Sequence, residues 1–205
     1  MTNTVRTPAD VANLALARMG YRLRVGSLYD GSAAAVKFLD IYGQTRDELL
    51  RANDWEFAER NVDLVLLKSA PPGGYVPPTV WDGNVNPPIG WLYEYALPAD
   101  YLKVRAVKPT PLFFPNLDPQ PYVYSIANDE FLSPPQRVIL CNVKDAVLVY
   151  TGQVTDPTTW DVGFTEAFAS ALARRLAPLL VGLEAAKLVV QDEAMSTAQA
   201  ESEQG

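Results

Sequence analysis

The N-terminal quarter of the chain repeats its hydrophobic positions with the period of an α-helix. Over residues 8–20, apolar side chains recur at every third or fourth position, and Thr7 and Pro8 are residues that favour a helix start. A second and stronger pattern of the same kind covers residues 32–52. We therefore expect two amphipathic helices here, paired as a hairpin.

The C-terminal part of the chain returns to the helical period. One apolar stripe is formed by Phe164, Phe168, Leu172, Leu176 and Leu179. Side chains at this spacing lie on one face, so the stripe predicts a long helix packed on the core. A further short helix is expected over residues 183–190, followed by a polar tail over residues 196–205.

The middle of the chain shows the alternation of β-strands and is rich in proline. Fourteen of the 17 prolines lie between Pro71 and Pro135, and proline disfavours helix interiors and central strands. We expect long arms over residues 70–90 and 109–121. Strands are expected at 62–66, 91–96, 102–106, 123–126, 137–141 and 146–151, the second and third forming a hairpin-like pair.

Together these patterns predict an α+β fold. The N- and C-terminal helices would form a helical bundle, and a proline-rich insertion of about five or six short strands would interrupt it. The corresponding segments are residues 1–58, a β-rich insertion over residues 59–155, and C-terminal helices with the tail over residues 156–205.

Composition narrows the range of functions. The 205 residues carry a net charge of −7, which disfavours tight binding to nucleic acid or anionic lipid. The absence of histidine excludes Ser-His and Cys-His nucleophiles and imidazole ligands for zinc. The single cysteine, Cys141, cannot form an intrachain disulfide and is expected to be buried. No signal peptide or membrane span is expected, and no cofactor, metal or catalytic residue is predicted.

Three segments resemble the head-tail adaptor proteins of tailed phages, the family of tail tubular protein A and the tail accessory factors. They occur in the family's order at residues 31–58, 91–104 and 150–177. The second is the most recognisable, because it is similar to the family's aromatic-Leu-Pro-Ala-Asp-x-Leu-Arg-Val element. The motif residues expected to have structural roles are Trp55, Phe57, Trp91, Tyr95, Pro98 and Asp100.

The resemblance implies a non-enzymatic virion protein located in the phage neck and assembled in the host cytoplasm. Such subunits form a homo-oligomeric ring, most often of twelve copies, beneath the portal protein. The ring extends the channel for double-stranded DNA, without sequence-specific binding, and provides a platform for the tail nozzle or tail tubular protein below. An acidic chain fits a lumen through which DNA slides, because it offers no cationic clamp to the phosphates.

Charged and polar residues near the helix ends are candidates for the subunit or portal interface. They are Arg18, Arg22, Arg24, Arg174, Arg175, Gln191 and Glu193. The first three also suit the C-terminal dipole of the first helix, and the next two also suit a solvent-facing surface. The last two belong to a C-terminal segment that the resemblance directs toward the portal.

Two other functions remain open from the residues alone. A cell-wall glycosidase used during infection would need two facing carboxylates, and the candidates are Glu48, Asp54, Glu56 and Glu59. A carbohydrate-binding module would use exposed aromatic faces on the strand containing Trp91, Tyr93 and Tyr95, although those side chains also suit a sheet packed on the core.

Overall fold

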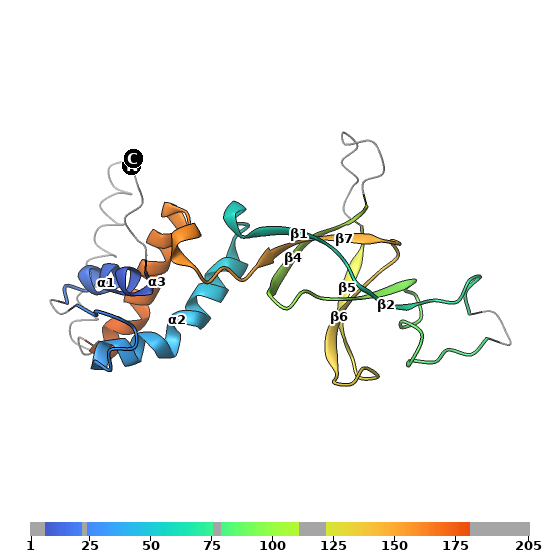
Figure 1. Ribbon diagram of the computed structural model, residues 1–205, viewed down its shortest axis with the longest axis horizontal. Helices are drawn as coiled ribbons and strands as arrows, with labels where there is room; N and C mark the ends of the chain where they lie inside the picture. Colours follow the sequence, from blue (N-terminus) through green and yellow to red (C-terminus); the bar gives the residue numbers. More distant parts are fainter. Residues whose placement is uncertain (1–6, 22–23, 76–78, 111–121, 181–205) are drawn as a thin grey trace, which may run out of the picture. The chain divides into compact units, whose positions relative to one another are not determined.

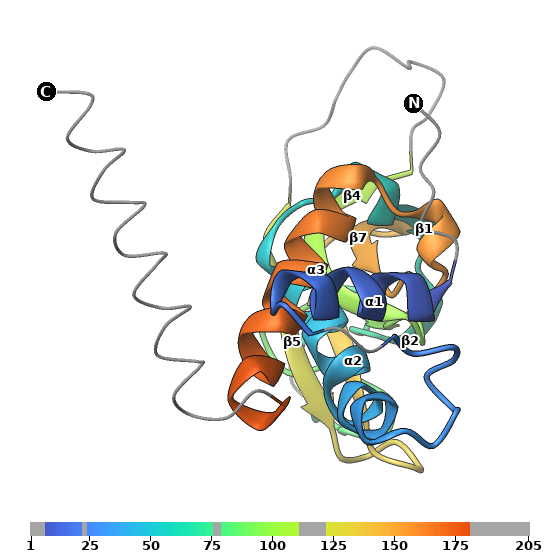
Figure 2. The same cartoon turned by 90° about the vertical axis from the view of Figure 1, so that its left-hand side faces the viewer.

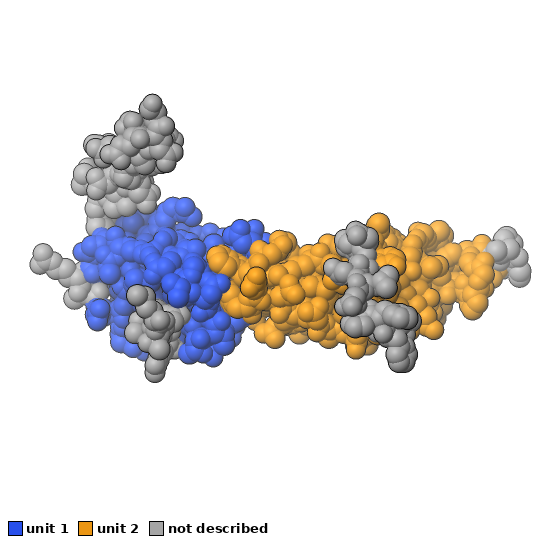
Figure 3. Space-filling view, turned by 90° about the horizontal axis from the view of Figure 1, so that it is seen from above, with its two compact units in different colours: residues 1–53, 154–205 blue, residues 54–153 orange. Residues whose placement is uncertain are grey.

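The computed structural model describes residues 7–21, 24–75, 79–110 and 122–180, and these contain three α-helices and seven β-strands (Figure 1). The chain divides into two compact units, coloured separately in Figure 3. Unit 1 consists of residues 1–53 and 154–205, and unit 2 of residues 54–153. The sequence patterns placed these two junctions after residues 58 and 155.

Unit 1 begins with helix α1, Pro8–Arg18, whose start follows from its sequence. Thr7 and Asp10 form a capping box, in which the Thr7 hydroxyl accepts from the Asp10 amide and the Asp10 carboxylate accepts from the Thr7 amide at 2.9 Å. The helix ends before Gly20, which has a φ of +68° that disfavours other residues. The expected N-terminal helix is therefore confirmed.

Helices α2, Ala33–Ala52, and α3, Val162–Leu180, complete the helical part of unit 1. The Ser32 side chain caps α2 by accepting from the Ala35 amide at 3.2 Å. Both α1 and α2 pack mainly against α3, and Figure 2 shows α1 lying across it. The first two helices are thus joined through α3, which differs from the expected hairpin. A short 3₁₀ turn, η2, Pro157–Thr159, precedes α3.

Aromatic side chains form the centre of unit 1. Phe168 stacks on Phe164, and its ring lies edge-on to Tyr42 from α2 and to Trp160. The α3 stripe predicted from the sequence is buried from Phe164 to Leu176, whereas Leu179 at its end is exposed. Edge-to-face aromatic contacts add to the free energy that burial contributes.

Unit 2 contains two antiparallel sheets. The three-stranded sheet has the order β1-β7-β4, and the four-stranded sheet has the order β2-β3-β6-β5. The strands are β1 Glu59–Asp63, β2 Leu66–Ser69, β3 Tyr93–Ala96, β4 Tyr101–Pro109, β5 Tyr124–Asp129, β6 Gln136–Cys141 and β7 Ala146–Gly152, and a 3₁₀ turn, η1 Glu56–Ala58, precedes them. Cys141 is buried, as expected.

The predicted fold class, α+β with terminal helices in a helical bundle around five or six strands, is wrong. The described residues form two antiparallel sheets of seven strands together with three helices, two of which contact the third. One reason is that the apolar run at 62–66 is not one strand. The Leu64 amide donates to Ala146 at 2.9 Å and the Val65 carbonyl accepts from Ala96 at 2.9 Å, so the chain changes sheet between two consecutive residues.

The expected hairpin of residues 91–96 and 102–106 is also wrong, because these two strands pair with segments that are distant in the sequence. Strand β3 pairs with β2 and β6, whereas β4 pairs with β7. Strand period alone identifies the strands but does not select their partners. The expected short helix at 183–190, the tail and most of the arm at 109–121 lie outside the described residues.

The structure also bears on the expected absence of a membrane span. None of the helices within the described ranges combines the length and apolar composition needed to cross a bilayer.

Candidate functional site

A proline-rich segment of unit 2, residues 79–92, forms an arm whose backbone is held by its own hydrogen bonds. The Trp81 indole donates to the Pro87 carbonyl at 2.8 Å, and the Asp82 carboxylate accepts from the Asn84 amide at 2.9 Å. At its end, the Leu92 carbonyl accepts from the Ala70 amide at 2.8 Å. Side-chain and backbone bonds of this kind give an irregular loop a defined conformation.

The arm presents apolar side chains to solvent. Val80 is 82% exposed, Ile89 70% and Val85 60%. Leu92 at the end of the arm is also exposed. A solvent-exposed apolar surface carried by a hydrogen-bonded loop is typical of a protein interface.

A buried charge cluster lies beneath the arm and joins it to the four-stranded sheet. Lys68 of β2 donates to the Gly83 carbonyl of the arm at 2.8 Å and forms a buried ion pair with Asp129 of β5. Its ammonium lies 3.6 Å from Oε1 of Glu94 on β3, a residue that is only 1% exposed. Lys68 of β2 therefore links β3 and β5 to the arm.

The arm fits this cluster closely at Gly83. A Cβ atom at this position would lie 2.5 Å from Cε2 of Phe131, so a larger residue would displace the ring. Phe131 in turn contacts the Trp81 ring edge-on, with centroids 5.9 Å apart. These rings and the three charged residues border a cavity of about 230 Å³.

Burial raises the pKa of both carboxyls, and the charge of Lys68 lowers both, but the net shifts differ in direction. Burial, reinforced by a hydrogen bond to Asp129, raises the pKa of Glu94 to about 7. Burial also acts to raise the pKa of Asp129, but hydrogen bonds with Lys68 and Glu94 outweigh it and lower that pKa. At neutral pH, the Lys68 ammonium therefore faces an ionised Asp129 and a partly protonated Glu94.

This cluster does not have the geometry of a glycosidase. Glu94 and Asp129 both pair with the buried Lys68 ammonium, whereas the carboxyls of such enzymes face a sugar across a gap of about 5 Å or more. Of the carboxylates proposed from the sequence, Glu48 pairs with Arg175, Asp54 with Lys103, and Glu59 with Arg105. Glu56 is exposed. Three of these side chains thus belong to ion pairs, and Asp54 and Glu59 both contact the Arg105 guanidinium.

Two of the arginines proposed for an interface are engaged inside unit 1. Arg18 of α1 bonds to the Glu166 carboxylate, to the Glu166 carbonyl at 2.8 Å and to Ser170 on α3. Arg175 of α3 bonds to Glu48 and, at 2.7 Å, to the Thr45 hydroxyl of α2. Both arginines thus tie the helices of unit 1 together.

The other proposed interface residues have different positions. Arg24 and Arg174 are exposed, and neither side chain forms an ion pair or hydrogen bond with a described residue. Arg22, Gln191 and Glu193 lie outside the described residues.

Two of the motif residues of unit 2, Pro98 and Asp100, hold the turn before β4 and connect it to neighbouring strands. The Asp100 carboxylate accepts from the Tyr150 hydroxyl at 2.9 Å and pairs with Arg60 at 3.1 Å. The Tyr101 amide donates to the Pro98 carbonyl at 3.1 Å, which closes the turn before β4. The Asp100 side chain therefore contacts β7 and β1.

The aromatic motif residues are packed and not arranged as a binding platform. The Tyr95 hydroxyl donates to the Val143 carbonyl at 2.8 Å, and the ring is buried. Trp91 is half-buried, with its amide bonded to Pro88 at 3.1 Å. The Trp55 carbonyl accepts from Arg105 at 2.6 Å, and the Trp55 ring lies 6.3 Å from that of Phe57.

Sequence reasoning missed Lys68 and Asp129. For Glu94, the sequence shows only a charged residue between Tyr93 and Tyr95 on a predicted strand, which does not indicate its buried partners. A charged residue at Lys68 next to apolar Leu66 and Leu67 is the one local sign that this position differs from its neighbours.

Comparison with known proteins adds no assignment: no family model matches the chain, and no curated protein is significantly similar to it in sequence. Within the ranges that the structure describes, no three Cys, Asp or Glu side chains are grouped so that they could hold a metal ion.

Proposed function

We propose that this protein is a structural subunit of a head-to-tail adaptor ring of a tailed phage. The ring, of about twelve copies by the family resemblance, would bind beneath the portal, extend the DNA channel and carry the tail nozzle. It would be assembled in the host cytoplasm and remain in the neck of the virion, without enzymatic activity.

The observation that carries this proposal is the arm of unit 2. Its exposed Val80, Val85 and Ile89 belong to a loop with fixed hydrogen bonds, and a buried lysine anchors that loop to the sheet. A ring subunit can bury these side chains against the neighbouring copy, which removes their apolar area from water. The net charge of −7 supports a lumen that does not retain DNA.

The experiment measures assembly directly. Native mass spectrometry and negative-stain electron microscopy would examine the protein alone and mixed with the portal of its own phage. We expect a ring on the portal for the wild type, and no ring for a Val80→Ser, Val85→Ser, Ile89→Ser triple variant that retains its melting temperature.

The matched control changes exposed apolar residues of unit 1, Val162→Ser and Leu179→Ser, and is expected to assemble. Normal rings from the arm variant would remove the arm from the interface. Clearing of a peptidoglycan suspension by the wild type, lost in Glu48→Gln or Glu59→Gln, would instead favour the glycosidase.

A further inference from the structure

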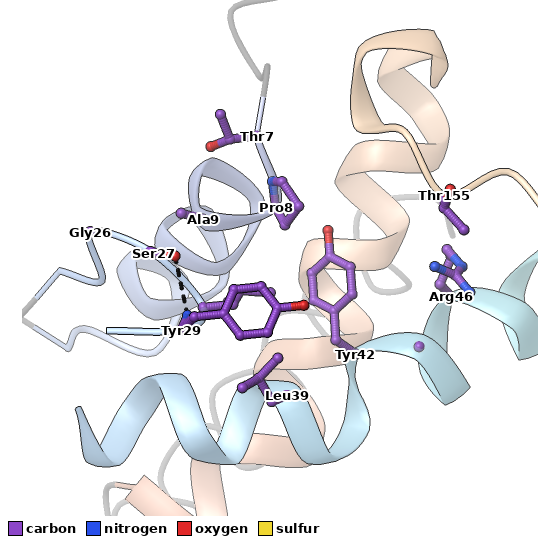
Figure 4. A pocket seen from close by; sticks show the side chains of 12 residues that line it. Thr7, Pro8, Ala9, Gly26, Ser27, Tyr29, Leu39, Tyr42, Arg46 and Thr155 are labelled. Atoms are coloured by element: carbon purple, nitrogen blue, oxygen red, sulfur yellow. Dashed lines mark hydrogen bonds between the residues drawn. The ribbon is translucent and has the colours of Figure 1, made fainter. Parts of the chain in front are cut away.

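Unit 1 contains a cavity of about 490 Å³ that has no part in the arm (Figure 4). Its walls come from the start of α1, the loop before α2, one face of α2 and the segment before η2. Figure 4 shows Leu39 and Tyr42 projecting from α2 into this space, with the Tyr29 ring lying across it. Its apolar walls are Pro8, Ala9, Leu28 and Leu39.

One hydrogen-bond donor in this cavity lacks a partner. The Tyr42 side chain is only 7% exposed, yet its hydroxyl makes no hydrogen bond to any described residue. Leaving a buried hydroxyl unpaired costs free energy, which a ligand could recover by accepting its proton in a hydrogen bond. Burial raises the pKa of Tyr42 well above its usual range, so the hydroxyl keeps its proton and remains a donor.

A cation borders the same space. Arg46 is buried and close enough to Tyr42 to oppose the rise in its pKa. Its Nε and Nη2 atoms both bond to one oxygen of Asp47 at 2.8 Å, which leaves Nη1 without a partner among the described residues. Arg46 and Thr155 are seen at the same end of the cavity in Figure 4.

The described lining holds a cation and several hydroxyl groups. Tyr42, Arg46 and Thr155 can all donate hydrogen bonds, and the described lining contains no carboxylate. A ligand that fits must supply acceptor atoms to the donors and apolar surface to Leu39, Leu28 and Tyr29. Because Asp47 already neutralises part of the Arg46 charge, a single negative charge suits the site better than a phosphate dianion.

We infer that the cavity of unit 1 binds a carboxylate attached to an apolar group, with the carboxylate at Tyr42 and Arg46 and the apolar group against Leu39. Such a ligand is either a small organic acid or the C-terminal residue of a peptide. The inference does not depend on the ring function, since it concerns unit 1 and not the arm.

The test is a titration of the ¹⁵N-labelled full-length protein, followed by NMR at pH 7. N-acetyl-L-leucine is the probe, and N-acetyl-L-leucinamide is its neutral control. We expect saturable shifts at the amides of residues 26–29 and Gly43 in the millimolar range, and binding of the amide weaker by about tenfold or more. Equal binding of both probes, or shifts that do not saturate, would refute the carboxylate site.

Two variants separate binding from folding. Tyr42→Phe is expected to weaken N-acetyl-L-leucine binding about tenfold while leaving the melting temperature unchanged or higher, because it removes an unpaired buried hydroxyl. Tyr124→Phe, in unit 2, is the matched control and should bind normally. Unchanged binding by Tyr42→Phe, or a lowered melting temperature, would show that the hydroxyl has another role.

The source of the carboxylate is distinguished by a third probe, acetyl-Ala-Ala-Leu with a free C-terminus. Binding at least as tight as that of N-acetyl-L-leucine assigns the site to a protein C-terminus, and weaker binding assigns it to a small organic acid. Failure of all three probes overturns the inference and leaves the adaptor proposal unaffected.

Discussion

The ion pairs that join the helices of unit 1 and the charge cluster that anchors the arm of unit 2 differ in burial. In unit 1, Arg18 and Arg175 connect helices through ion pairs that are largely open to solvent, around a core made of aromatic and aliphatic groups. In unit 2, Lys68, Glu94 and Asp129 are themselves in the interior. Solvent screens exposed ion pairs, so losing one changes the free energy of unfolding little. A buried charge that loses its partner lowers that free energy by much more. Both units have apolar cores, so the comparison concerns the charges: losing one of these exposed pairs in unit 1 should cost little stability, whereas losing Lys68 in unit 2 should cost much more.

The largest effect is expected from removing the cation of the buried cluster. Lys68→Met leaves two carboxyls in the interior without a counter-charge and frees the Gly83 carbonyl, so the protein should lose about 3–5 kcal/mol of stability. Urea unfolding measures the loss, and hydrogen exchange should become faster across the arm. Lys103→Met, which removes an exposed partner of Asp54, is the control and should cost about 1 kcal/mol or less.

A core truncation in unit 1 is next in size. Leu172 is fully buried on α3, so Leu172→Ala should destabilise the protein by about 2–5 kcal/mol through lost burial and the cavity that remains. Leu179→Ala on the same helix is exposed and should change stability by only about 0.5 kcal/mol. Similar melting temperatures for the two variants would contradict this arrangement of α3.

Glu94 should make stability depend on pH. Its pKa rises from 4.5 in the unfolded chain to about 7 in the folded protein, so the folded state binds the proton more tightly between these values. The resulting stabilisation is complete below pH 4.5 and is lost as the pH rises through 7, a change of roughly 3 kcal/mol. Asp129 acts in the opposite direction at lower pH, because its lowered pKa stabilises the fold above its unfolded value.

Urea unfolding between pH 4.5 and 7.5 measures this dependence, and Glu94→Gln serves as the comparison because it does not titrate. The difference in stability between wild type and variant should fall across this interval. Parallel curves for the two proteins would mean that Glu94 is ionised throughout.

The smallest effects are expected at the exposed pairs of unit 1. Arg18→Ala and Arg175→Ala each remove an ion pair between helices, and each should cost about 0.5–1 kcal/mol after solvent screening. Urea unfolding at low and high salt checks this, since the cost should shrink as salt increases. If either variant lost as much stability as Lys68→Met, the proposed difference between the two units would be wrong.

Local signals predicted the helices well. Thr7 with Asp10 and the Ser32 cap mark two helix starts, and the spacing from Phe164 to Leu176 gives the buried face of α3. These features depend on residues within one or two turns, which a single sequence displays directly. The strands at 136–141 and 146–152 were also predicted to within a residue.

The partners of the strands and the charged sites could not be predicted in the same way. Arg18 meets Glu166 across 148 positions, and no local pattern couples Lys68 to Asp129. Arg18 and Arg175 suited an outside partner in the sequence because their internal partners are distant in the chain. The cavity of unit 1 could not be predicted either, because its walls come from segments that are distant in the sequence.

The discontinuity of unit 1 determines the order in which the protein can mature during synthesis. Helices α1 and α2 leave the ribosome first, but α3, which covers their apolar faces, begins only at Val162. All strands of unit 2 are translated in between, so unit 2 can complete its sheets while the first two helices still lack their partner. Nascent chains stalled before residue 162 should therefore carry exposed apolar helices and bind chaperones, and release of α3 should end that binding.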